Sequence, residues 1–163
     1  MTTHSAAPKR DNVVALRQSK AERVSNRKWS APVMKLGFCI IPSLLLRAQQ
    51  RLGLNPTQLA VLLQLADYWW DKDRKPYPSK RDLSDRLGLS ERQIQRHIAD
   101  LEAAGLVQRI ERYGDSGEKT SNEYDLSGLV ERLKKIAPEI EEANEIKRQA
   151  TRRGGVKNKR NQK

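Results

Sequence analysis

Two short helical patterns separated by a glycine turn constrain this chain most, and they lie between Ser79 and Ala104. Ser79 can cap the first helix, and Ser90 with Gln93 three residues later forms a capping box for the second. Gly88, between them, suits a helix end that needs a positive φ. The stretch therefore predicts two helices joined by a tight turn.

Apolar residues recur at helical spacing in both halves of this stretch. Leu83 and Leu87 stripe the first helix, and Ile94, Ile98 and Leu101 stripe the second. Because each stripe must be buried, we expect both helices to pack on one core. Two helices joined in this way form a helix-turn-helix, whose second helix usually enters the major groove of DNA.

A β-hairpin is predicted directly after the second helix. Residues 106–113 suit a strand, residues 114–121 are rich in turn formers, and residues 122–126 suit the returning strand. A hairpin in this place is the wing of a winged helix. We therefore predict a mainly α fold with a small β-hairpin, the winged helix-turn-helix, with its recognition helix over about 91–104 and its wing over about 106–126.

The residues upstream predict the front of the same domain. Helices are expected over about 42–52 and 55–70, because Pro42 and Pro56 suit first helical positions and Gly53 ends the first helix. The adjacent aromatic residues at 68–70 are expected at the edge of the core. Residues 29–41 suit a short strand or extended segment, in which Cys39 is expected to be buried.

Beyond the wing, Ser127 can cap a further helix, and Pro138 is expected to interrupt it before a second helix that runs to about Ala150. An apolar stripe with heptad spacing crosses this region, at Leu129, Leu133, Ile136, Ile140 and Ala143. The stripe suits packing on its own domain and dimerisation equally well, and the sequence leaves both open.

The net charge of +12 is concentrated at the two ends of the chain. Residues 1–30 carry seven Lys or Arg against two acidic residues, and residues 147–163 carry eight and no acid. Residues 31–146 carry 17 basic and 18 acidic residues, so that the middle is almost neutral. Basic tails either bind a polyanion such as DNA through salt-dependent contacts or only keep the chain in solution.

These features divide the chain into four parts. We expect a disordered basic arm over 1–30, the winged domain over 31–126, a helical extension with a possible role in dimerisation over 127–150, and a basic disordered tail over 151–163.

A helical wheel identifies the residues that would meet DNA. With the apolar stripe of the second helix inward, the outward face carries Arg92, Gln93, Gln95 and Arg96, the side chains that pair with guanine and adenine edges. Contacts to backbone phosphates are expected from Ser79, Lys80, Arg81, Ser90, His97, Arg109, Arg112 and Lys119. His97 falls at the margin of the inward face, so it suits packing as well as a phosphate contact. The alternative for the charged side chains is an ordinary solvated surface.

Several motifs resemble those of the winged helix-turn-helix domains of bacterial and phage DNA-binding proteins. They are Tyr77-Pro-Ser, Leu87-Gly-Leu-Ser, Arg92-Gln-Ile-Gln-Arg-His-Ile, Gly105-Leu-Val and Asn122-x-Tyr-Asp-Leu. The front half, with Ile41-Pro42 and Leu59-Ala-Val-Leu-Leu-Gln-Leu, looks like that of phage and plasmid replication initiators. The resemblance covers about residues 36–130 and implies DNA binding, but it does not separate regulators from initiators.

The sequence thus predicts a sequence-specific, double-stranded-DNA-binding transcriptional regulator, a homodimer on an inverted repeat. The alternative is a replication-initiation or partition protein of a plasmid or phage that binds origin or centromere repeats and recruits a partner protein. No clustered carboxylates, Ser/His/Asp spacing or glycine-rich phosphate loop indicate an enzyme, and no cofactor is expected.

The place of the protein in the cell follows from the same sequence. One cysteine excludes an internal disulfide, and two distant histidines give no zinc spacing. No apolar run suits a membrane span. We therefore expect the reducing cytoplasm of a bacterium, in association with nucleoid or plasmid DNA.

Overall fold

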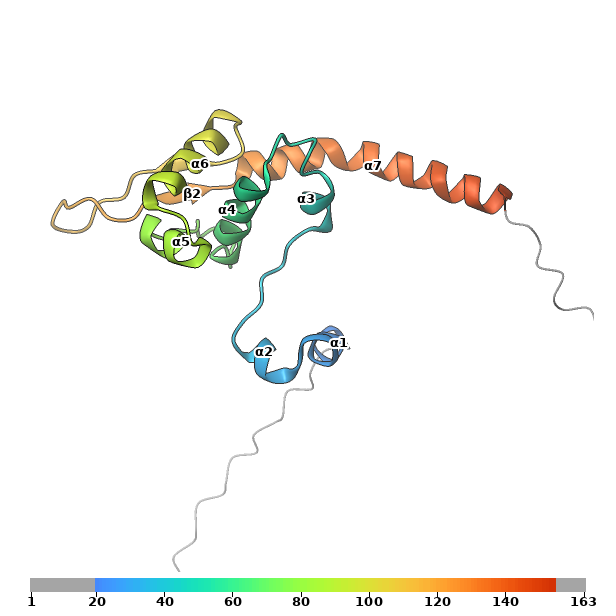
Figure 1. Ribbon diagram of the computed structural model, residues 1–163, viewed down its shortest axis with the longest axis horizontal. Helices are drawn as coiled ribbons and strands as arrows, with labels where there is room; N and C mark the ends of the chain where they lie inside the picture. Colours follow the sequence, from blue (N-terminus) through green and yellow to red (C-terminus); the bar gives the residue numbers. More distant parts are fainter. Residues whose placement is uncertain (1–19, 155–163) are drawn as a thin grey trace, which may run out of the picture. The chain divides into compact units, whose positions relative to one another are not determined.

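The computed structural model describes residues 20–154, and the chain divides into two compact units, Met1–Phe38 and Cys39–Lys163. The described part of the first unit holds two helices, α1 (Lys20–Trp29) and α2 (Ala31–Lys35) (Figure 1). These helices correct the predicted disorder over residues 20–29 and the predicted strand or extended segment over residues 29–35, whereas residues 37–42 have neither helix nor strand. α1 contains few apolar residues and α2 has a proline in its first turn, so the sequence analysis selected neither helix. The part of the basic arm over residues 1–19 lies outside the described residues.

The second unit contains the predicted helix-turn-helix and hairpin. Its elements are α3 (Ser43–Arg47), α4 (Pro56–Asp67), α5 (Lys80–Leu87), α6 (Glu91–Ala103), β1 (Gln108–Ile110), β2 (Glu123–Asp125) and α7 (Ser127–Gly154). α5 and α6 are the two helices of the helix-turn-helix, and the β1–β2 hairpin follows α6 directly. The fold is therefore mainly α with one small hairpin, a winged helix-turn-helix, as predicted.

Capping boxes begin both helices of the helix-turn-helix. The Ser79 hydroxyl accepts the backbone N–H of Asp82 at 3.0 Å, and the Asp82 carboxylate accepts the backbone N–H of Ser79 at 3.1 Å. Hydrogen bonds from the side chain and backbone of Ser79 lower the pKa of Asp82. Ser90 and Gln93 make the same reciprocal pair at the start of α6. Gly88 ends α5 with a φ of 65°, so the turn between the helices is closed by local bonds alone.

The hairpin is shorter than predicted but lies where it was expected. β1 and β2 are antiparallel, with Arg109 opposite Tyr124, and an isolated bridge joins Tyr113 to Lys119 nearer the tip. The backbone N–H of Tyr124 donates to the carbonyl oxygen of Pro76 at 2.9 Å, which fastens β2 to the segment before α5. The hairpin is thereby held against the helix-turn-helix.

The core of the second unit takes apolar side chains from all of its helices. Its buried members are Leu45, Ala48, Leu52, Leu54, Val61, Leu62, Leu65, Leu83, Ile94, Ile98, Leu101, Leu106, Val107, Tyr124, Leu126, Leu129, Leu133 and Ile136. The first three members of the heptad stripe, Leu129, Leu133 and Ile136, are thus buried inside their own domain. They are not available for the dimer contact that the sequence left open.

α7 runs through Pro138 without a break, which corrects the predicted interruption. A proline inside a helix removes one hydrogen bond and crowds the preceding turn. Here Ile136 before it is buried and Ile140 after it packs against the same core, so tertiary contacts hold both halves in line. The helix also extends over Thr151–Gly154, where a tail was expected, and residues 155–163 lie outside the described residues.

Four further expectations for this unit are corrected. α3 ends at Arg47 rather than near residue 52, and α4 ends at Asp67 rather than near residue 70. Trp70 lies beyond the end of α4 with 74% of its surface exposed, so it is not a core residue. Cys39, expected to be buried, is exposed because it lies before α3 in a segment that does not pack on the core.

Gly128 allows α7 to begin close to the turn after α6. A Cβ added to Gly128 would lie 2.2 Å from the carbonyl oxygen of Gly105, and a backbone atom has little room to move. We predict that Gly128→Ala lowers the free energy of unfolding by about 1–3 kcal/mol in a urea titration. A decrease in the free energy of unfolding would indicate the steric clash, because alanine is the better helix former and would otherwise stabilise α7.

Gly114→Ala is the matched control for this substitution. Its added Cβ would meet only the end of the Glu118 side chain, which can rotate away. A loss for Gly128→Ala that is no larger than that of the control would contradict the prediction.

Candidate nucleic-acid interface

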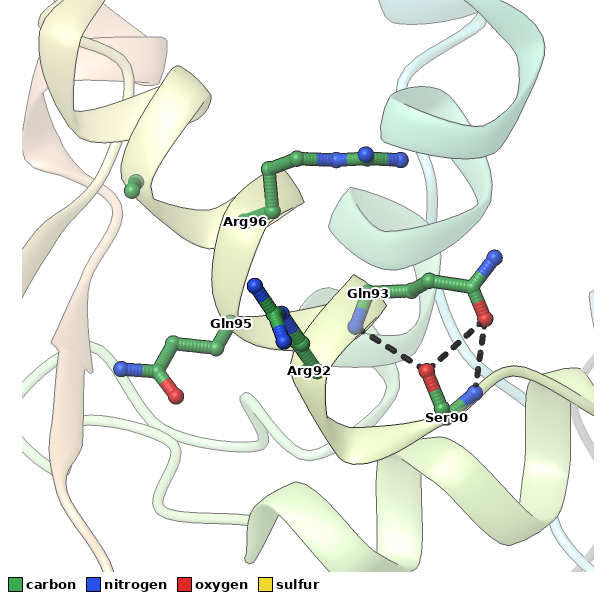
Figure 2. Close-up of a pocket in the computed structure, with 6 residues that line it drawn as sticks. Ser90, Arg92, Gln93, Gln95 and Arg96 are labelled. Carbon is green, nitrogen blue, oxygen red and sulfur yellow. Dashed lines mark hydrogen bonds between the residues drawn. The ribbon is translucent and has the colours of Figure 1, made fainter.

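The outward face of α6 presents the side chains that the helical wheel selected. Ile94 and Ile98 are buried, whereas Arg92, Gln95 and Arg96 are exposed. Figure 2 shows Arg92 between Gln95 on one side of the helix and Gln93 on the other, with Arg96 further along the helix. They surround an open hollow of about 520 Å³, which is lined by Ser90, Arg92, Gln93, Gln95, Arg96 and Ala99. Ala99 adds only a methyl group, so no large side chain projects from that part of the face.

Gln93 caps the start of α6, in addition to any contact that it makes with a base. Its side-chain oxygen accepts hydrogen bonds from the backbone N–H and the hydroxyl of Ser90, each at 2.9 Å (Figure 2). Only its amide nitrogen is then available to a ligand while the cap is intact. The hydroxyls of Ser90 and Ser79 are likewise engaged in their caps, so a phosphate contact from either would compete with a helix start.

Arg92 and Arg96 differ from most other cations near them, because neither has a carboxylate within 4 Å among the described residues. Lys80, at the start of α5, shares this property, and the nearest carboxylate to Arg81 is that of Asp85 at 4.0 Å. The charges of Arg92, Arg96 and Lys80 are therefore not neutralised by any carboxylate of the described residues. A cation of this kind contributes its full charge to an incoming anion.

The three cations of the wing each have an acidic partner. Arg109 pairs with Glu102 at 2.5 Å, Lys119 pairs with Glu111, and Arg112 lies 3.4 Å from Glu123. The Arg112 guanidinium also lies over the ring of Tyr77 at 4.6 Å. These pairs fasten the wing to α6 and close its hairpin, so the wing carries less free positive charge than its sequence suggests.

The pKa values of two of these carboxylates, Glu102 and Glu111, are lowered. Burial alone would raise the pKa of Glu102, but hydrogen bonds from the side chain and backbone of Arg109 outweigh it, and the pKa is lowered. The hydrogen bond with Glu111 raises the pKa of Lys119, and the same bond lowers the pKa of Glu111. The carboxylates of Glu102 and Glu111 are therefore ionised at pH 7 and can hold their cations in place.

A second hollow, of about 760 Å³, lies between the start of α5, α6 and the wing. It brings together six of the predicted residues, namely Ser79, Lys80, Arg81, Gln95, Arg109 and Lys119. Three carboxylates, Glu91, Glu102 and Glu111, also line it, so its charge is nearly balanced. Thr120, Ser121 and Asn122 line it too and add neutral donors that the sequence analysis did not select. Their only signal was a polar stretch at the tip of a predicted hairpin.

His97 is 8% exposed and does not line either hollow, so in this structure it belongs to the packed face of α6. Its phosphate contact stays a prediction. Its Nδ1 has no hydrogen-bond partner, and the nearest carboxylate oxygen, on Asp100, lies 3.9 Å away. The side chain lies at the margin of the buried stripe, where the wheel left packing and phosphate contact open, and packing is what the structure has.

Two other kinds of site were sought in the part of the chain that the structure describes. Between residues 20 and 154, no three His, Cys, Asp or Glu side chains gather in a way that could hold a metal ion. The helices of the same range include none that is long and apolar enough to cross a membrane.

Comparison with known proteins gives a family match for the middle of the chain. Residues 52–107 match a family described as a helix-turn-helix domain, a range that contains α4, α5 and α6. The comparison with curated proteins gave no match.

Three solved structures are similar over most of their lengths. The N-terminal domain of the DnaD protein from Geobacillus kaustophilus is 21% identical, over 79% of this chain and 97% of that chain, with a TM-score of 0.47. A possible transcriptional regulator from Methanosarcina mazei is 19% identical, over 66% and 85%, with a TM-score of 0.41. The multiple antibiotic-resistance repressor from Listeria monocytogenes is 18% identical, over 85% and 86%, with a TM-score of 0.40.

These structural likenesses are distant, and no assignment rests on them. The family match and the arrangement of α5, α6 and the β1–β2 hairpin are independent of them and agree with each other. The chain therefore contains a helix-turn-helix domain of the winged type.

Proposed function

We propose that the protein binds double-stranded DNA sequence-specifically and regulates transcription, with α6 in the major groove and the wing on the sugar-phosphate backbone. One observation carries this proposal. The exposed face of α6 presents two arginines that have no acidic partner among residues 20–154, flanked by glutamines, around an open hollow. A cationic helix face of this composition suits the edges of bases in a major groove, which is about 12 Å wide.

The proposed roles follow from position. Arg92 and Arg96 lie one turn apart near the start of α6, where recognition helices make most of their base contacts. Their guanidinium groups can each donate two hydrogen bonds to guanine, and Gln95 can pair with adenine. Lys80 and Arg81 begin α5, the helix that crosses the DNA backbone in this motif.

Arg96 is expected to read a base. We predict that Arg96→Ala weakens specific binding by about 1–3 kcal/mol and relaxes the preference at one base pair, while binding to random DNA changes little. Fluorescence anisotropy on a set of single-base-pair variants of the bound site measures both effects. Arg132→Ala, which removes an exposed cation from α7, is the control. An equal loss of affinity for all sequences would show that Arg96 contacts phosphate instead.

Lys80 and Arg109 are expected to behave differently although both line the second hollow. We predict that Lys80→Ala lowers the slope of log DNA affinity against log salt concentration by about one, because the charge of Lys80 is free to contact a phosphate. Arg109→Ala should leave the slope unchanged and lower the free energy of unfolding by about 1 kcal/mol, because it breaks the bond to Glu102. Glu102 would still accept the backbone N–H of residue 109, which limits the loss. A fall in slope for Arg109→Ala would mean that the pair opens on DNA.

We also propose that the protein binds as a homodimer on an inverted repeat, because one α6 covers only a few base pairs and two copies double the site. The contact must lie outside Leu129, Leu133 and Ile136, which are buried in each copy. Sedimentation of the full chain with a duplex that holds an inverted repeat is expected to show two copies per duplex. One copy per duplex would remove the dimer from the proposal.

Genome-wide mapping of binding sites tests the regulatory role. Sites scattered at promoters, with altered expression of the adjacent genes when the protein is removed, are the expected result. Binding confined to one cluster of repeats at a replication origin or centromere would replace the regulator with a replication-initiation or partition protein that recruits a partner.

A further inference from the structure

A second cationic surface lies outside the matched helix-turn-helix region. Arg47 at the end of α3 and Lys147, Arg148 and Arg152 on the second half of α7 surround one hollow of about 540 Å³. Asn144 and Thr151 complete its lining. We call it the α3–α7 hollow. Figure 1 shows that this half of α7 extends past the other helices of its unit, so the hollow is open to solvent on the α7 side.

The charges of the α3–α7 hollow are largely uncompensated. Among the described residues, only Arg148 has a carboxylate within 4 Å, that of Glu145 at 3.8 Å. Glu139, five residues before Asn144, is engaged by Arg51. Four exposed cations gathered in this way repel one another, and the repulsion is relieved when an anion binds between them.

The dipole of α7 explains only part of this cluster. Cations are favourable near the C-terminus of a helix, which accounts for basic residues on the last turns of α7. Arg47 comes from a different element, 100 residues before Lys147 in the sequence, and the dipole of α7 gives no reason for its place. Its convergence with three cations of α7 is the observation that indicates a binding surface.

We infer that the α3–α7 hollow binds the phosphate backbone of DNA at a site separate from α6. The inference takes the identity of the polyanion from the proposed function. Arg148 and Arg152 are four residues apart, so they lie on one face of α7 with a rise of about 6 Å between them. One DNA strand carries a phosphate for about every 3.4 Å of helix axis, so cations at this spacing can contact more than one phosphate of the same backbone. The DNA is either the flank of the duplex that α6 reads or a second duplex.

Removal of the charges tests the inference in the full chain. The test variant is Arg47→Gln/Lys147→Gln/Arg152→Gln. The control is Arg132→Gln/Lys134→Gln/Lys135→Gln, which removes the same charge from exposed positions on the first half of α7. Circular dichroism melting shows that both are folded. Anisotropy on a random-sequence duplex of about 30 base pairs, titrated with salt, gives the slope of log affinity against log salt.

The expected result is a slope that falls by about 2–3 in the test variant and by less than about 1 in the control. At about 100 mM salt the test variant should bind at least about tenfold more weakly than the control. Its base-pair preference should be that of the unmodified protein. Equal changes in the two variants would overturn the inference. Binding of both variants to anionic lipid vesicles is measured as well, and a test variant that binds DNA like the control but binds the vesicles more weakly would also overturn it.

Two further arms identify the source of the phosphate. If it is the flank of the same duplex, lengthening the site by about one helical turn strengthens binding by the unmodified protein and not by the test variant. If it is a second duplex, an immobilised duplex retains a labelled one through the unmodified protein and not through the test variant. Either result supports the inference, and the absence of both overturns it.

Failure of this inference and failure of the proposed function give different results. If Arg96→Ala leaves the base preference unchanged while the test variant still loses its slope, α6 is not a reader and the α3–α7 hollow stands. If Arg96→Ala relaxes the preference while the test variant behaves like the control, the proposed function stands and the hollow is not a DNA site.

Discussion

Burial of one apolar stripe on α6 sets the geometry of the whole interface. Ile94, Ile98 and Leu101 are almost completely buried, so α6 cannot rotate about its axis without exposing them. One residue step is about 100° of rotation, and the inward stripe therefore determines that Arg92 and Arg96 face outward. The Ser90–Gln93 cap and the left-handed turn at Gly88 fix where the helix begins. The candidate readers are thus positioned by the core and by local hydrogen bonds, before any ligand is present.

Positive charge has two different uses in this domain. On the wing, Arg109 and Lys119 bind carboxylates of the same domain, and their charges stabilise the position of the hairpin. On α6 and at the start of α5, Arg92, Arg96 and Lys80 have no such partner among the described residues. A net-charge count cannot separate these uses, because it gives a paired and an unpaired arginine the same value. The proposed interface is defined by which cations are free rather than by how many there are.

Features that depend on a few adjacent residues could be predicted from the sequence. The caps at Ser79 and Ser90 and the hairpin after α6 are of this kind, since each follows from a short motif with one favourable geometry. The helix ends at Arg47 and Asp67 were missed because boundaries depend on tertiary contacts that propensity does not include. His97 lies one step from the buried stripe, a difference too small for a wheel to resolve.

Pro138 connects the largest error of the sequence analysis to the second cationic surface. The local rule that proline ends a helix holds for an isolated segment, but here burial of Ile136 and packing of Ile140 offset the lost hydrogen bond. Because α7 continues through Pro138, Lys147 and Arg152 lie on the same continuous helix as Leu133, which is buried in the core. A helix broken at Pro138 would not hold them beside Arg47. The α3–α7 hollow therefore depends on core contacts that keep α7 helical through Pro138. These contacts join residues far apart in the sequence, so the hollow could not be predicted from the sequence.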